Sequence, residues 1–177
     1  MRIDLIKRWL GSWLQQCLLR RAPQDDPLSY SALQWSLAAY VLMDLLQAGT
    51  SSDWPVSLGM TLLDTLVMVL FAWTVLLLMK KPARLVQTLT ALAGTGTILG
   101  IVGLPLILQA AQTQVQDGPA GILLLGWVLL LVWSIAVQAH IFRHALSTGF
   151  GGGLLLAGLH TVLIVILVET LFPRVAG

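Results

Sequence analysis

The sequence predicts an all-α integral membrane protein, a bundle of five transmembrane helices preceded by an amphipathic cytoplasmic helix. Three observations lead to this fold class. Of the 177 residues, 57% are hydrophobic and only 10% are charged, whereas soluble domains are about one quarter charged. Five long apolar segments follow one another with short polar connectors between them. The basic residues fall almost entirely on one side of the resulting topology.

Composition also limits the kind of partner that the protein can have. A chain of this length cannot form an interior large enough to hide so much apolar surface from water, so we expect lipid to be its main solvent. A formal net charge of +2 gives no indication of a nucleic-acid partner. The single cysteine, Cys17, excludes an intramolecular disulfide and a CxxC redox pair.

The N-terminal segment, residues 1–27, is predicted to be an amphipathic helix followed by a turn. On a helical wheel, one face carries Ile3, Ile6, Trp9, Leu10, Trp13, Leu14 and Cys17. The other face carries Asp4, Arg8, Ser12, Gln15 and Gln16. The tryptophans Trp9 and Trp13 suit a helix that lies in the cytoplasmic headgroup layer. A helix that binds a partner protein would show the same pattern.

The transmembrane domain, residues 28–177, contains five segments long and apolar enough to cross a bilayer. Their predicted bounds are 29–48, 56–79, 85–109, 122–142 and 150–172. The connectors "GTSSDWP", "KKPAR", "QTQVQDGPAG" and "RHALSTG" carry turn formers or charges that are unfavourable in hydrocarbon. The first span is the least apolar because it includes Gln34 and Asp44.

Charge distribution predicts the orientation. With five spans, nine of the ten Lys and Arg residues lie on one side of the membrane, and only Arg174 lies on the other. Positive residues favour the cytoplasmic side. The sequence therefore predicts a multi-pass protein of the inner (plasma) membrane with a cytoplasmic N-terminus and an external C-terminus.

A cluster of His140, Arg143 and His144 lies where the fourth span ends. His140 and His144 are four residues apart, as in metal-binding helical pairs, and Cys17 is on the same side of the membrane. A simpler interpretation is that these side chains anchor the helix end at the cytoplasmic interface. We predict no metal site and expect interface anchors, namely Arg143, His144, Lys80, Lys81 and Arg84.

Acidic residues inside the predicted spans must face protein or water. Asp44 and Glu169 are expected near the outer surface, where they can reach the headgroups. Asp64 is deeper, at a predicted depth similar to that of His160. These two residues form a candidate intramembrane polar pair, either a clamp between helices or part of a proton relay.

Small residues predict where helices pack closely. In the third span, Gly96, Gly100 and Gly103 form one stripe, and Gly153 and Ala157 begin another in the fifth span. Such stripes let a second helix approach.

Catalytic motifs are missing from the sequence. There is no GxSxG, HExxH, P-loop or CxxC motif. We therefore predict no catalytic residues, no enzymatic activity and no cofactor.

The stretches "ALAGTGTILGIVGLPLILQ" and "LLLVWSIAVQAHIFRHAL" resemble the third and fourth spans of the Yip-domain (Ypt-interacting-protein) family, whose bacterial members are small multi-pass membrane proteins. The resemblance covers roughly residues 29–172 and implies a five-span fold. The Asp-Leu-Tyr-Gly-Pro signature of the eukaryotic members is absent, so the resemblance carries no trafficking role.

Two functions are open at this point. The first is a non-enzymatic scaffold or assembly partner, whose contacts are the lipid bilayer and another membrane protein or a second copy. The second is a small oligomeric transporter or channel component that uses Asp64 and His160. The identity of a partner or transported species does not follow from the sequence.

Overall fold

A computed structural model describes residues 2–50, 53–113 and 120–173, and all regular elements within these ranges are helices. The predicted all-α fold is confirmed for this part of the chain. The longer helices are α1 (Arg2–Cys17), α2 (Tyr30–Ala48), α3 (Trp54–Leu78), α4 (Leu85–Thr113), α5 (Ala120–Leu146) and α6 (Phe150–Leu171). Two short 3-10 helices, η1 (Pro23–Asp25) and η2 (Pro82–Arg84), lie in the connectors.

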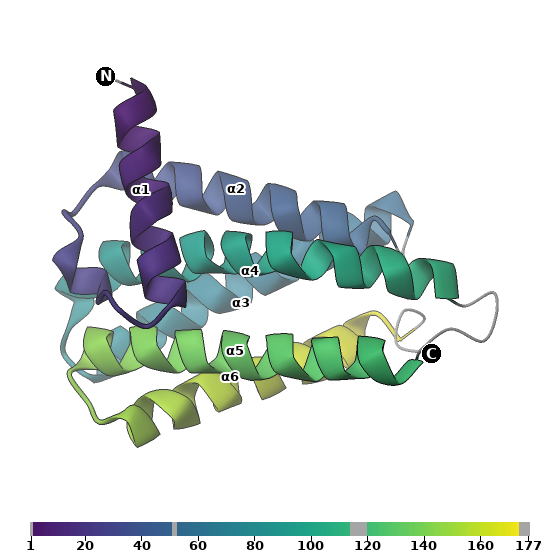
Figure 1. Cartoon of the computed structure of the whole chain (residues 1–177). Helices are drawn as coiled ribbons and strands as arrows, with labels where there is room; N and C mark the ends of the chain where they lie inside the picture. The colour runs from purple at the N-terminus through teal and green to yellow at the C-terminus, as the bar shows by residue number, and fades with distance from the viewer. Residues whose placement is uncertain (1, 51–52, 114–119, 174–177) are drawn as a thin grey trace.

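Helices α2 to α6 run side by side in alternating directions, and α1 lies across them near one end (Figure 1). That end contains the start of α2 and the α3–α4 and α5–α6 connectors, and we call it the basic end because Lys80, Lys81, Arg84 and Arg143 lie there. Helix α4 is central, since it packs against α1, α2, α3 and α5. Helix α6 packs mainly against α5.

Four helices are long and apolar enough to cross a membrane, in the ranges Trp54–Leu78, Pro82–Ala110, Gly121–Leu146 and Phe150–Leu171. The predicted segment 29–48 forms helix α2, but this helix is not sufficiently apolar to join them. Gln34, Asp44 and Gln47 lower its average. Composition and length therefore support four spans, and a fifth needs a different argument.

Helix α5 ends later than predicted. It continues through Arg143 and His144 to Leu146, so these residues belong to the last turn of the helix and not to a connector. Cations from the α3–α4 connector stabilise its last carbonyl groups. The other span boundaries differ from the predicted ones by at most four residues.

The interior of the bundle contains both apolar and polar side chains, and its outer surface is largely apolar. Buried residues include Leu92 and Phe142 as well as Ser36, Thr61 and Thr95, whereas large apolar side chains are exposed along every helix from α2 to α6. Exposure of so much apolar surface is unfavourable in water but favourable in lipid. The polar side chains turn inward because protein groups supply the hydrogen bonds that lipid cannot.

The predicted small-residue stripes lie at helix contacts. A Cβ atom at Gly96 would meet the ring of Tyr40, and one at Gly100 would meet Met43 and Gln47, so this part of the stripe packs against α2. Gly103 faces Leu130 of α5 instead. At Gly153 a Cβ would be only 2.2 Å from the carbonyl oxygen of Ala139, and Ala157 is fully buried. These two residues hold α6 against α5.

Candidate functional site

Helix α1 is docked on α4 through a tryptophan and a glycine. A Cβ at Gly94 would be 2.4 Å from the indole of Trp13, so only glycine leaves room for this ring. Trp13 is buried and Trp9 is half-buried beside it. The indole Nε1 of Trp133 in α5 donates to the carbonyl of Cys17 at 2.9 Å, which satisfies a free acceptor at the end of α1.

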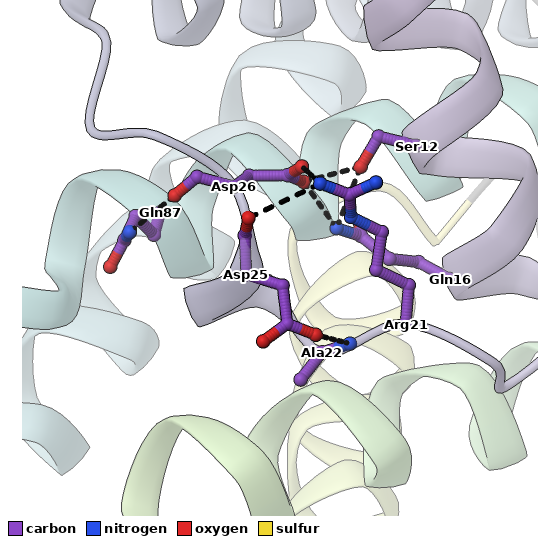
Figure 2. A network of polar contacts seen from close by, with 7 residues as sticks. All are labelled: Ser12, Gln16, Arg21, Ala22, Asp25, Asp26 and Gln87. Atoms are coloured by element: carbon purple, nitrogen blue, oxygen red, sulfur yellow. Dashed lines mark hydrogen bonds and ion pairs between the residues drawn. The ribbon is translucent and has the colours of Figure 1, made fainter.

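A buried carboxylate, Asp26, joins α1 to the bundle (Figure 2). It accepts hydrogen bonds from the Ser12 hydroxyl and from Gln16 Nε2, the latter at 2.8 Å. Its other oxygen pairs with Arg21 at 2.8 Å. The Asp26 carbonyl accepts from Gln87 Nε2 of α4 at 2.6 Å. We call this set of contacts the Asp26 joint. It fixes α1, the following loop and α4 to one another.

The Asp26 joint changes the predicted faces of α1. Ser12 and Gln16 were expected on a solvent-facing polar side but are buried, with exposed fractions of 3% and 0%. Leu10 and Leu14 were expected on the same apolar face as Trp13 but are 43% and 50% exposed. The reason is the Asp26 carboxylate, because a buried charge needs donors and the polar side chains of α1 supply them.

Burial also defines the state of the lone cysteine. Cys17 is 1% exposed, and its Sγ lies 3.8 Å from the carbonyl oxygen of Thr95. Burial raises the pKa of this thiol from 9.0 to about 11. The thiolate is the reactive form, so Cys17 is a structural thiol at neutral pH.

The predicted anchor residues cap the end of α5. Lys81 Nζ donates to the carbonyl of Leu146, and Arg84 Nη1 donates to the carbonyls of His144 and Ala145 at 3.0 and 2.9 Å. Cations at a helix C-terminus satisfy free carbonyls and interact favourably with the helix dipole. Lys80 is exposed in the same connector.

The histidine cluster connects α5 to the N-terminal segment. His140 Nε2 donates to the carbonyl of Arg21 at 3.0 Å, and the rings of His140 and His144 lie 4.6 Å apart. The guanidinium of Arg143 lies 5.8 Å from the centre of the Phe150 ring. Among the described residues, no three His, Cys, Asp or Glu side chains are grouped so that they could hold a metal ion.

Asp64 and His160 have different partners. Asp64 accepts a hydrogen bond from the Tyr40 hydroxyl of α2, whereas His160 Nδ1 donates to Gln138 Oε1 of α5 at 3.0 Å. The His160 ring packs on Phe71, which is seven residues beyond Asp64 in α3. Seven residues correspond to roughly 10 Å along a helix. Asp64 and His160 therefore differ in depth, and no hydrogen bond joins them among those of the described residues.

A cleft of about 270 Å³ lies between α2, α4 and α5. Its apolar lining includes Leu99, Ile107 and Leu130. Its polar lining consists of Tyr40, Asp44, Gln47, Ser134 and Gln138. Asp44 lies four residues before the end of α2, about one turn from the outer end of this helix, and its neighbours Met43 and Gln47 contact Gly100 of α4. Helix α2 is much shorter than α4, so the end of α2 lies well before the end of α4.

The Asp26 joint escaped sequence reasoning because it depends on contacts between elements that no local pattern shows. The segment "RAPQDDP" appeared only as a turn, and its adjacent charges, Arg21, Asp25 and Asp26, are the signal from which an ion pair could have been predicted.

The comparisons with known proteins returned nothing that defines the site: no family model, no curated protein and no solved structure matches the chain.

Proposed function

We propose that the protein is a non-enzymatic, multi-pass protein of the inner (plasma) membrane that crosses the bilayer five times and acts as a scaffold or assembly partner of other membrane proteins. The proposal has three parts: the fifth span, the orientation and the role in assembly.

The distribution of polar and apolar side chains on α2 supports the fifth span. Its outward residues Trp35, Leu42 and Leu46 are 76%, 59% and 54% exposed, while Ser36 is fully buried. Its Tyr40 donates to Asp64 of α3. A helix at a water interface would show the opposite distribution. Its 19 residues are about 28 Å long, close to the roughly 30 Å thickness of the hydrocarbon core.

The basic end supports a cytoplasmic N-terminus. The α3–α4 connector carries Lys80, Lys81 and Arg84, Arg143 is in the last turn of α5, and the loop after α1 carries Arg20 and Arg21. All of these positions lie at the same end of the bundle (Figure 1). With five spans the C-terminus is external; Arg174, the only predicted external cation, lies outside the described residues.

Helix α1 fits a position at the cytoplasmic interface. Its outward leucines, Leu10 and Leu14, are 43% and 50% exposed, as is Leu18 just beyond its end at 53%, and Lys7 and Arg8 are exposed on the same helix. Leucines in the acyl boundary with cations among the headgroups are typical of interfacial helices.

The observation that carries the assembly role is an uncovered small-residue face on α6. A Cβ atom at Gly151 or Gly158 would have no atom within 4 Å, in contrast to Gly153 on the α5 side. These two glycines belong to a shallow groove lined only by α6 residues: Gly151, Leu154, Leu155, Gly158, Leu159 and Val162. A helix of another membrane protein, or of a second copy, can approach such a face closely.

The test is a copurification in mild detergent that compares Gly158→Leu with Gly121→Leu. A Cβ atom at either position would meet no other atom within 4 Å, so neither substitution is expected to disturb the fold. We expect wild type and Gly121→Leu to retain a stoichiometric partner or self-association and Gly158→Leu to lose it. Isolation of the wild type only as a lone monomer would contradict the proposal.

The alternative is a small oligomeric transporter or channel component. The hydrogen-bonded Tyr40 and Asp64 inside the bundle favour it, because intramembrane ionisable residues commonly mark substrate or ion paths. Proteoliposome flux that disappears in Asp64→Ala would promote this function over the scaffold. We also propose that the chain is a Yip-like protein, and this assignment is supported by the sequence resemblance alone.

A further inference from the structure

The cleft between α2, α4 and α5 contains one charged side chain, Asp44. Asp44 is partly buried and faces the hydroxyl of Thr61 in α3. A neutral hydroxyl fills only part of the acceptor capacity of a carboxylate and does not balance its charge. An ionised carboxylate at this depth is costly unless a cation lies beside it.

The other polar groups of the cleft are occupied within the chain. Gln47 Nε2 donates to the carbonyl of Gly100 at 2.8 Å, and Ser134 donates to the carbonyl of Leu131 at 2.8 Å. The Tyr40 hydroxyl donates to Asp64, and Gln138 accepts from His160. Asp44 is therefore the one charged group in the lining of the cleft, and it has no ionic partner among the described residues.

The described part of the chain does not supply a cation for Asp44. No Lys or Arg occurs in residues 22–79, 85–142 or 144–173. Among the described residues, the cations lie in α1 or at the basic end, whereas Asp44 lies four residues before the opposite end of α2. A second copy has the same sequence, so its described residues offer no lysine or arginine at this level either.

The cleft opens on the outer surface of the bundle. Trp127 and Leu131 in its lining are 37% and 50% exposed, which places part of the lining at the lipid-facing surface. Its volume of about 270 Å³ accommodates a long side chain but not a whole helix, whose diameter is about 10–12 Å. An incoming helix would therefore lie over the cleft and insert one residue.

We propose that this cleft binds a transmembrane helix of a different protein, which inserts a Lys or Arg side chain from the outer part of its span to pair with Asp44. The inference rests on the proposed assembly function and names the chemistry of the partner. The aliphatic part of the basic side chain would pack against Leu99 and Leu130, and its charged end would reach the carboxylate. Opposite charges within membrane bundles pair in this way.

The experiment measures resonance energy transfer between full-length protein and synthetic transmembrane peptides in liposomes. The peptides are Leu/Ala helices that differ only in one residue about one turn from the outer end of the span: Lys, Leu or Glu. We expect the Lys peptide to associate at least about tenfold more tightly than the Leu peptide, and the Glu peptide to show no preference over Leu. Equal association of the Lys and Leu peptides would overturn the proposal.

Matched variants identify the acid responsible. Asp44→Asn should abolish the preference for the Lys peptide. Asp64→Asn should keep it, because Asp64 accepts from Tyr40 and does not line the cleft. A preference that survives in Asp44→Asn would contradict the proposal. Thermal unfolding of each variant verifies that it is folded.

A charge-reversal variant gives a second test if Asp44→Asn alters the fold. Asp44→Lys should bind the Glu peptide in preference to the Lys peptide, and the opposite order would contradict the proposal. Failure of these peptide experiments with an intact Gly158-dependent assembly would remove only the cleft as an interface. Loss of the Gly158-dependent assembly with intact peptide binding would remove the α6 face instead.

Discussion

Helices α2 and α6 have similar lengths, 19 and 22 residues, but different relations to the rest of the bundle. Helix α6 is apolar enough to be recognised as a membrane span from composition, and α2 is not. In α6 the buried residues are Gly153, Ala157 and His160. In α2, Ser36 is buried and Tyr40 and Gln47 form hydrogen bonds to other helices, while the outer side carries Trp35, Leu42 and Leu46, with an exposed Gln34 in the first half of the helix.

The difference shows that average apolarity is a poor measure of whether a helix meets lipid. A helix that contacts lipid on one side needs an apolar surface on that side only. Helix α2 packs extensively on α4, so its polar side chains can be satisfied by protein. Helix α6 also contacts two helices, α5 and α3, but it buries only Gly153, Ala157 and His160, and its composition is more apolar than that of α2.

The largest expected effect separates the two faces of α6. Gly153→Leu should reduce the free energy of unfolding by more than ~3 kcal/mol, because a Cβ there would already be 2.2 Å from the Ala139 carbonyl oxygen. Gly158→Leu should change it by less than ~0.5 kcal/mol. Unfolding in mixed micelles measures both. Equal effects would show that α6 does not pack on α5 through the Gly153 face.

A charge on the outer face of α2 should have the next largest effect. Leu42 is 59% exposed and lies in the second half of α2. If α2 crosses the membrane, Leu42→Arg should cost about 2.5–3.5 kcal/mol in membrane insertion, and Leu42→Ala should cost much less. A glycosylation-based insertion assay measures the difference. Normal insertion of Leu42→Arg would mean that this face of α2 meets water.

The hydrogen bond between α2 and α3 should make a smaller contribution. Tyr40→Phe and Asp64→Leu should each reduce the free energy of unfolding by about 0.6–2 kcal/mol, since each removes the same bond between helices. The double variant should lose less than the sum of the two, which a double-mutant cycle would measure. Tyr30→Phe is a control, because Tyr30 is 67% exposed in the same helix. Strict additivity would contradict the contact.

The smallest effect on the fold concerns Cys17. Because burial raises the pKa of its thiol to about 11, alkylation at pH 8 should be on the order of a hundredfold slower than for a free cysteine. Its contribution to stability should be complete below pH 9.0, the ordinary value, and should be lost as the pH rises through about 11. Alkylation followed by mass spectrometry measures the rate, with detergent-unfolded protein as the control.

Removal of the Asp26 carboxylate gives the matching test of the joint. Asp26→Ala leaves Ser12, Gln16 and Arg21 without their shared acceptor, so α1 should separate from α4 and Cys17 should react faster. Rapid alkylation in the wild type would show that α1 is not docked.

The sequence predicted well what depends on local composition. The four apolar spans and the stripe of Gly96, Gly100 and Gly103 follow from residue type and spacing alone. It predicted poorly what depends on rotation of one helix against another. Asp64 and His160 have similar predicted depths, yet they lie at different levels and face different helices. The burial of Gln16 depends on Asp26, ten residues away in the loop after η1.

The end of α5 shows a second limit. His140, Arg143 and His144 suggested that the helix ends at the first charges, but Arg84 caps carbonyls beyond them and allows the helix to continue to Leu146. The continuation of α5 to Leu146 depends on the packing of the α3–α4 connector against α5, which the sequence of α5 does not reveal.

Labelling of single cysteines in whole cells tests most directly whether α2 crosses the membrane. In a Cys17→Ser background, Arg20→Cys, Thr50→Cys and Lys80→Cys are treated with a membrane-impermeant maleimide. We predict that position 50 reacts in intact cells, while positions 20 and 80 react only after permeabilisation. Positions 20 and 50 reacting from the same side would contradict the fifth span and, with it, the external C-terminus.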